Sequence, residues 1–199
     1  MKKVLSLILV FVMCLSLCAC GGGGTATEPE IVKYKVNETA ISSLFECKLK
    51  NVSFAEKVDL GSYRYMLPAT ESTTTLRSAK SGNVLLCFAV ELKYIGTRTI
   101  QNMGFGNGSA AIGFYATYDG TYTYTDFVAS RYEDYSWTHY ETYAGHTSYC
   151  CSFAPLSDDT LSVRAYIELP AVVVENTDKP LDITVCLGNN ESVTFAINP

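Results

Sequence analysis

Apolar and polar residues alternate with a period of two through much of the chain, and this alternation favours β-strands over helices. Within residues 45–50 apolar side chains alternate with charged ones, and apolar positions resume at Val52 and Phe54 after a one-residue slip that is typical of a β-bulge. Residues 83–96 have one fully apolar face, whereas the opposite face begins apolar and ends charged. This segment is therefore predicted to be a central strand with one face buried and the other half covered.

Turn sequences separate further segments of this kind and indicate hairpins. Asp119 and Gly120 join the alternating segments 111–118 and 121–128, because glycine readily supplies the positive φ of a tight two-residue turn. More strands are predicted at 147–154, 162–169, 182–187 and 192–198, with residues 188–190 as the turn between the last two. Residues 56–82 are expected to form a long loop or irregular excursion with short helical turns. Short strands with frequent turns predict an all-β sandwich.

Residues 1–19 have the organisation of a secretory signal rather than of a folded element. A basic start precedes the apolar run Val4–Leu17, which is too short for a comfortable membrane span. The run closes with Leu17-Cys18-Ala19-Cys20, which resembles the lipobox of bacterial lipoproteins. The resemblance implies that Cys20 receives a diacylglyceryl group and that residues 1–19 are cleaved off. The alternatives are an ordinary secretory signal and an uncleaved anchor.

Residues 20–30 are predicted to be the lipidated cysteine followed by a flexible, glycine-rich linker. Ten such residues reach roughly 17 Å in root-mean-square distance, enough to hold a domain just off the lipid headgroups. Two acyl chains on one residue give a stable membrane anchor. Residues 31–199 are then one β-domain, which we expect at the outer face of the cytoplasmic membrane, lipid-anchored after secretion.

The order of segments resembles the immunoglobulin-like domains of unknown function found on lipoproteins of Gram-positive bacteria. The matching pieces, which together cover most of residues 40–198, are "CKLKNVSFAE", "FAVELKYIGTRTI", the Asp-Gly hairpin, "YAGHTSYCCSFAPL" and the closing "VRAYIELPAVVVENTDKPLDITVCLGNNESVTFAI". The chain departs from that pattern at Tyr94-Ile95-Gly96, where such domains often have Asn-x-Gly, and at Ala144-Gly145, where they often have Pro-Gly. The resemblance implies an immunoglobulin-like antiparallel β-sandwich and transfers no catalytic residue.

The charge balance argues against nucleic acid as a partner. The formal charge of −5 becomes −7 once Lys2 and Lys3 leave with the signal, and the sequence has no basic stripe. An acidic domain also has no electrostatic reason to lie on an anionic membrane. The membrane is therefore expected to be a partner through the lipid anchor alone.

Five cysteines follow the anchor: Cys47, Cys87, Cys150, Cys151 and Cys186. The odd count leaves at least one unpaired unless it bonds another chain. A Cys47–Cys151 disulfide is one option, because both residues fall on apolar faces of predicted strands. The preferred interpretation is that these cysteines are buried as small apolar side chains.

Candidate catalytic and metal-binding residues are sparse. The chain has two histidines, His139 and His146, whose spacing matches no known set of metal ligands. Residues 104–109 are glycine-rich but lack the spacing of a phosphate-binding loop. We therefore expect no metal and no cofactor. A hydrolase would have to use His139 or His146, without an identifiable oxyanion site.

Aromatic residues are concentrated between residues 115 and 149, which hold nine of the fourteen tyrosines and the only tryptophan. One interpretation is strand propensity, because tyrosine and threonine suit β-sheets. The other is a binding surface, because rigid aromatic rings with polar tips suit glycan or protein contacts. We predict that four residues are at least partly exposed on a loop beside the hairpin and form a partner surface: Tyr132, Tyr135, Trp137 and Tyr140.

The sequence thus predicts a binding or interaction module without enzymatic activity, serving adhesion, envelope assembly or ligand capture. A cell-wall glycan or another envelope protein is the expected kind of partner. The alternative function is a cell-envelope hydrolase using His139 or His146.

Overall fold

The computed structural model describes residues 31–59, 64–65, 76–106, 110–131, 138–143, 146–158 and 160–198. The described residues from Val32 on belong to one compact unit. They form strands almost throughout, and their single helix, α2 (Val172–Glu175), has four residues. No helix in these ranges combines the length and the apolar character needed to cross a lipid bilayer.

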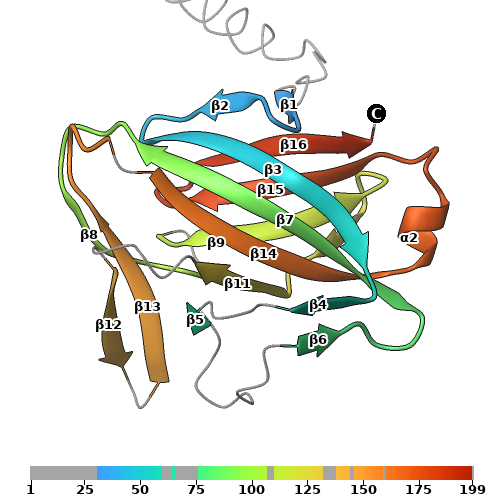
Figure 1. Ribbon diagram of the computed structural model, residues 1–199. Coiled ribbons are helices and arrows are strands. Elements are labelled where there is room, and N and C mark those ends of the chain that lie inside the picture. Colours follow the sequence, from blue (N-terminus) through green and yellow to red (C-terminus); the bar gives the residue numbers. More distant parts are fainter. Residues whose placement is uncertain are drawn as a thin grey trace, which may run out of the picture. The chain divides into compact units, whose positions relative to one another are not determined.

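Two large sheets build the domain (Figure 1). The five-stranded sheet has the order β1 (Lys33–Lys35), β16 (Ser192–Asn198), β15 (Leu181–Leu187), β9 (Ile112–Tyr118) and β10 (Tyr122–Tyr124). The six-stranded sheet has the order β2 (Thr39–Ile41), β3 (Phe45–Ala55), β7 (Asn83–Tyr94), β14 (Thr160–Pro170), β11 (Phe127–Arg131) and β5 (Arg64–Tyr65). A three-stranded sheet contains β12 (Thr138–Tyr143), β13 (His146–Phe153) and β8 (Ile100–Gly104), and β4 (Lys57–Asp59) pairs with β6 (Leu76–Ser78).

The main core lies between the two large sheets. Phe88 of β7 and Phe114 of β9 meet there edge to face, with ring centroids 5.5 Å apart. Inward residues of β3, β7 and β14 join those of β9, β15 and β16 in one buried apolar cluster. The predicted all-β antiparallel sandwich is thereby confirmed.

Strand β7 is central in its sheet, as its sequence pattern predicts. It pairs with β3 on one side and with β14 on the other. Its inward residues Leu86, Phe88 and Val90 are buried, whereas the outward residues change from the buried Leu85 to the half-buried Glu91 and Lys93. The apolar half of the outer face is therefore covered by something other than the main core.

The predicted bulge is present in β3. Lys50 pairs with Ala89 and Ser53 pairs with Cys87, so β3 contains one more residue than β7 over this stretch. Asn51, inside the bulge, has a φ of 53°. Asparagine tolerates this left-handed conformation better than most residues.

Two predicted segments fold differently from the expectation. Residues 121–128 divide between the sheets, because β10 pairs with β9 and β11 pairs with β14. The exposed Thr125 and Asp126 separate the two strands, and a polar pair of this kind suits the passage between sheets. Within residues 56–82, the described parts form the short strands β4, β5 and β6 instead of helical turns.

Both predicted hairpins are present. Asp119 and Gly120 have φ values of 52° and 65°, and Thr121 donates its backbone N–H to Tyr118 at 3.1 Å. In the β15–β16 hairpin, Gly188 and the two asparagines after it also have positive φ. Asparagine and glycine occupy the positions where these turns need that conformation.

The cysteines divide between the interior and the two sheet surfaces. Cys47, Cys150 and Cys151 are buried, as predicted, whereas Cys87 and Cys186 are half-buried. Cys47 is a free thiol, so the alternative Cys47–Cys151 disulfide is not formed in this structure. Burial raises the pKa of the Cys47 thiol far above its ordinary value, which keeps it protonated.

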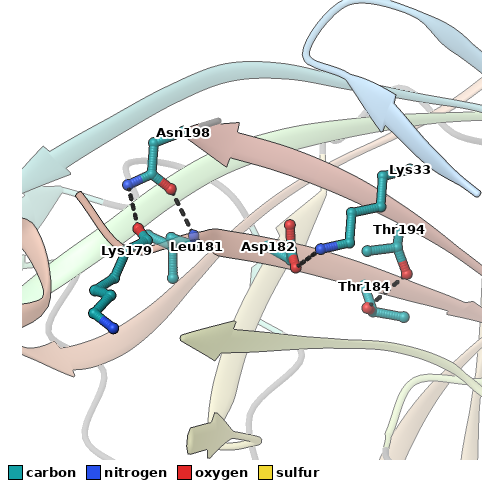
Figure 2. A network of polar contacts seen from close by, with 7 residues as sticks. All are labelled: Lys33, Lys179, Leu181, Asp182, Thr184, Thr194 and Asn198. Atoms are coloured by element: carbon teal, nitrogen blue, oxygen red, sulfur yellow. Dashed lines mark hydrogen bonds and ion pairs between the residues drawn. The ribbon is translucent and has the colours of Figure 1, made fainter. Parts of the chain in front are cut away.

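Strand β1 is attached to the five-stranded sheet by its parallel pairing with β16 and by an ion pair (Figure 2). Lys33 Nζ lies 2.7 Å from Asp182 Oδ2 of β15. Asp182 is 5% exposed, and its Oδ1 accepts no hydrogen bond from any described residue. Beside this pair, the buried hydroxyls of Thr184 and Thr194 share a hydrogen bond of 3.0 Å.

Glu191 connects the β15–β16 hairpin to the loop between β2 and β3. Its carboxylate accepts hydrogen bonds from the Ser43 hydroxyl and from the Ser43 backbone N–H, the latter at 2.9 Å. The hydroxyl hydrogen bond is the main reason that the pKa of Glu191 lies below its ordinary value of 4.5. The ionised form is thus favoured in the folded state.

We expect Glu191 to stabilise the fold above about pH 4.5 and to lose this contribution as the pH falls through its lowered pKa. Glu191→Gln should therefore reduce the free energy of unfolding at pH 7, and the difference from the wild type should shrink toward pH 3. Urea denaturation across this range measures it, with Glu175→Gln on α2 as the control. A difference that is the same at pH 7 and pH 3 would contradict the expectation.

Candidate functional site

A pocket of about 180 Å³ lies on the outer face of the six-stranded sheet. Residues of β3, β4, β7 and β14 line it. Figure 1 shows β4 beside the part of the sheet where β3, β7 and β14 run together. We refer to this feature as the outer-face pocket.

The floor of the pocket consists of small side chains on β7. Ala89 lies between Lys50 of β3 and Arg164 of β14, and Cys87 lies between Ser53 and Tyr166. Residues directly opposite each other in antiparallel strands point to the same side of the sheet. A methyl group beside the long side chains of Lys50 and Arg164, and a thiol beside the ring of Tyr166, leave a depression in the middle of this surface.

Strand β4 builds one wall by packing onto the same face. Val58 contacts a second apolar cluster, which contains the buried Leu85 and Tyr166 and is separate from the main core. This cluster is what covers the apolar half of the outer face of β7. The bulge at Asn51 and Ser53 forms the wall on the side of β3.

Glu168 fastens the chain between β6 and β7 to the sheet. Its Oε1 accepts hydrogen bonds from the Lys80 backbone N–H and from Asn83 Nδ2, each 2.8 Å long. Partial burial alone would raise the pKa of Glu168, but these two hydrogen bonds together with the positive charge of Lys80 outweigh it, and the pKa lies below its ordinary value. The carboxylate is therefore ionised at neutral pH and holds the end of β6 next to β7.

The polar groups of the pocket carry both signs of charge. Arg164 lines it from β14 and Asp59 from β4, and both residues are exposed to solvent. Asn51 and Ser53 also line the pocket, from β3, with an amide and a hydroxyl. The neighbouring Lys50 is engaged with Glu91, with 2.6 Å between the ammonium nitrogen and the carboxylate oxygen.

The thiol in the pocket is suited to contact rather than to nucleophilic attack. Cys87 donates its S–H to the carbonyl oxygen of Leu85 at 3.7 Å. Burial raises the pKa of Cys87 above its ordinary value, so that it is a neutral thiol at pH 7. The thiolate is the reactive form of cysteine. Across the described part of the chain, no three His, Cys, Asp or Glu residues gather as metal ligands would.

Most of the residues singled out from the sequence lie outside the described ranges. These are Cys20, Tyr132, Tyr135 and Trp137. Tyr140 is in β12, where its backbone pairs with Tyr149, so its predicted place on a loop is wrong. Its predicted exposure stays a prediction, as does the partner surface.

The two histidines are in neighbouring strands of the same hairpin. His139 of β12 pairs with Cys150, and His146 of β13 pairs with Tyr143. They are therefore not partners of each other in the strand register. The use of either in a hydrolase stays a prediction.

Sequence reasoning did not identify the outer-face pocket, although two of its signals are in the sequence. One is the slip in alternation that marks the bulge at Asn51. The other is the pair of small residues Cys87 and Ala89 on the outward face of the central strand. The contributions of Asp59 and Arg164 become visible only when the fold brings β4 and β14 to the same face.

Comparison with protein-family models and with curated proteins gives no match. Two solved structures are similar to the chain. An uncharacterized beta-sandwich protein from Clostridium difficile 630 is 23% identical with a TM-score of 0.47, over 86% of this chain and 98% of that one. A "putative lipoprotein (ycdA)" from Bacillus subtilis subsp. subtilis str. 168 is 17% identical with a TM-score of 0.39, over 83% of this chain and 39% of the other. Neither name states a ligand or an activity.

Proposed function

We propose that this protein is a binding module without enzymatic activity, an immunoglobulin-like β-sandwich held outside the cytoplasmic membrane by a lipid on Cys20. The signal, the lipobox resemblance and the glycine-rich linker support the anchor. The two packed, mainly antiparallel sheets support the sandwich fold. Ligand capture is the form of binding that we favour.

The outer-face pocket is the observation that carries the proposal. It combines an apolar floor with a few polar groups that converge on it, which is the usual composition of a small-molecule site. Its floor, β7, pairs along its length with the flanking strands β3 and β14, so the polar groups on these strands are held on a rigid frame. Such a frame lowers the entropic cost of binding.

Two cysteines provide a direct test of whether the pocket takes a ligand. Cys87 lines the pocket, whereas Cys186 lies on β15 in the other sheet. Both are half-buried, and burial raises the pKa of both thiols. A ligand in the pocket should slow alkylation of Cys87 and leave that of Cys186 unchanged.

The measurement is mass-spectrometric alkylation of the folded protein with a small maleimide in the presence of four probes. These are leucine, methyl N-acetylglucosaminide, acetate and inorganic phosphate, each at millimolar concentration. We expect at least one to slow Cys87 labelling several-fold, and Ala89→Leu, which fills the floor, to abolish that protection. Protection of neither cysteine by any probe would contradict ligand capture at this pocket.

The anchor makes a separate prediction. Cys20→Ala should remove the acyl mass shift and move the protein from the membrane fraction to the soluble fraction, because the thiol of Cys20 is the proposed lipid attachment point. Cys18→Ala is the control and should change neither. A Cys20→Ala protein that still sediments with membranes as a lipidated species would refute the anchor.

A further inference from the structure

We infer that one end of the sandwich inserts apolar loop residues into the surface of the lipid bilayer to which Cys20 tethers the domain. The inference rests on the proposed anchor and goes beyond it, because it adds a contact between the folded domain and the membrane. Its supports are three exposed apolar side chains at this end, the backbone conformation of one of them, and the direction in which β1 enters the fold.

The end in question is the one where β7 ends and where β3 and β14 begin. The first residues of β3 and β14 pair with Tyr94 and Lys93, the last two residues of β7. The β15–β16 hairpin reaches the same end, because Glu191 accepts a hydrogen bond from the Ser43 backbone N–H just before β3. Figure 1 shows these strand ends together on the left and α2 on the right. We refer to this part of the domain as the loop end.

Three connected segments at the loop end each expose an apolar side chain. Ile41 at the end of β2 is 64% exposed, Ile95 directly after β7 is 38% exposed, and Leu156 between β13 and β14 is 100% exposed. Ile95 donates its backbone N–H to the loop between β2 and β3 at 2.8 Å, and Asp158 lies 3.3 Å from Lys93 Nζ. A single exposed apolar residue needs no explanation, whereas several at one end of a domain are typical of a binding surface.

Leu156 is in a backbone conformation that leucine rarely adopts. Its φ is 63°, and every other non-glycine residue with positive φ in the described part of the chain is an asparagine or aspartate. Leu156 follows Pro155 in a turn, at a position where positive φ favours glycine or asparagine. The fold gains no burial from this side chain, because it is fully exposed. Its apolar surface is therefore available for a contact outside the domain.

The direction of β1 indicates what this end contacts. β1 runs parallel to β16, and Lys33 pairs with Thr194, the third residue of β16. Since β16 begins at the hairpin that reaches the loop end, β1 also begins on that side. The linker after Cys20 joins the domain there, and its reach is roughly 17 Å. The proposed anchor thus keeps the bilayer close to the loop end.

The anchor also makes a weak contact sufficient. Even a single myristoyl chain gives only marginal membrane binding, so a few side chains would not hold a free domain. Tethering turns the contact into an intramolecular one with a high effective concentration. Charge is not the driving force, because Asp158 and Glu191 at this end are acidic and are engaged with Lys93 and Ser43. The contact should therefore form on electrically neutral lipid.

The test compares a tryptophan at each end of the domain. The lipidated protein with Leu156→Trp or Val172→Trp is reconstituted into phosphatidylcholine vesicles whose acyl chains carry bromine, which quenches tryptophan in the bilayer. Val172 is the matched control, because it is 51% exposed and lies on α2, after the opposite end of β14. After subtraction of the wild-type emission, which comes from Trp137, quenching should be several-fold stronger for Leu156→Trp than for Val172→Trp.

Further substitutions test whether the apolar side chains act together. In the Leu156→Trp protein, adding Ile95→Asn should weaken the quenching, whereas adding Val172→Asn should not. In the otherwise native protein, Leu156→Asn should not lower the free energy of unfolding, because asparagine tolerates the left-handed conformation. A clear loss of stability from Leu156→Asn would mean that the leucine serves the fold, and it would overturn the inference.

The outcomes separate this inference from the anchor on which it rests. A protein that does not float with the vesicles would refute the anchor and the inference together. A protein that floats, but whose two tryptophans are quenched equally or not at all, would overturn the inference and leave the anchor intact. Quenching of Leu156→Trp that appears only with anionic lipid, or is lost in high salt, would also overturn it, because the contact would then depend on charge.

Discussion

Phe45→Ala is expected to lower the free energy of unfolding by about 3–5 kcal/mol, the usual cost of emptying a buried phenylalanine site. Phe45 is fully buried, and its ring contacts those of Tyr94 and Phe153 at centroid distances of 5.4 and 5.0 Å. Because Phe153 belongs to β13, the same ring joins the six-stranded sheet to the three-stranded one. Its truncation therefore leaves a cavity at a junction of two sheets.

Urea denaturation measures the loss, and the melting temperature should fall by roughly 6–20 °C for a chain of this size. Phe54→Ala is the matched control, because Phe54 is in the same strand and is 38% exposed. Phe54→Ala should lower the free energy of unfolding much less than Phe45→Ala does. Equal losses at the two positions would show that burial between the sheets is not what makes Phe45 important.

Lys33→Met should lower the free energy of unfolding by about 2–3 kcal/mol, because it leaves the Asp182 carboxylate buried without its cation. Removing one partner of a fully buried ion pair costs roughly 3–5 kcal/mol. We expect less here, since the Lys33 side chain is 44% exposed and water screens part of the attraction. The penalty is still large, because the second oxygen of Asp182 accepts no hydrogen bond from the described residues.

Lys35→Met is the control for this prediction, since Lys35 is an exposed lysine of the same strand. It should change the free energy of unfolding by a few tenths of a kcal/mol. Adding Asp182→Asn to Lys33→Met should recover part of the loss, because the buried charge is then gone. Equal stabilities of Lys33→Met and Lys35→Met would show that the ion pair contributes nothing measurable.

The elements that sequence reasoning predicts well are those whose burial is decided within one strand. The alternation in residues 83–94 reflects the burial of one face of β7 against the core. Both the existence of the strand and its central place in the sheet can therefore be predicted from the alternation. The slip at Asn51 likewise marks the bulge of β3. The positive φ of Asp119 and Gly120 is a local property of the turn and is also readable in the sequence.

What the sequence does not reveal depends on contacts between distant segments. Residues 121–128 alternate as one strand, yet they divide between two sheets because β9 and β14 offer separate partners. Asp182 does not interrupt the alternation of apolar and polar residues in its strand. Its carboxylate can be buried because it is paired with Lys33, which lies 149 residues away in the chain. The outer-face pocket needs β3, β4, β7 and β14 together, so no single segment carries its signature.

The parallel pairing of β1 with β16 also determines how the domain responds to mechanical force. With Cys20 anchored as proposed, a force that pulls the domain away from the membrane runs along the linker and enters the fold at β1. Along the backbone it reaches β3, which carries Asn51 and Ser53 of the pocket, through β2. The Lys33–Asp182 ion pair and the three residue pairs between β1 and β16 therefore bear the load first. Peeling them away would release about 10 Å of extra tether and leave the pairing of β3, β7 and β14 intact.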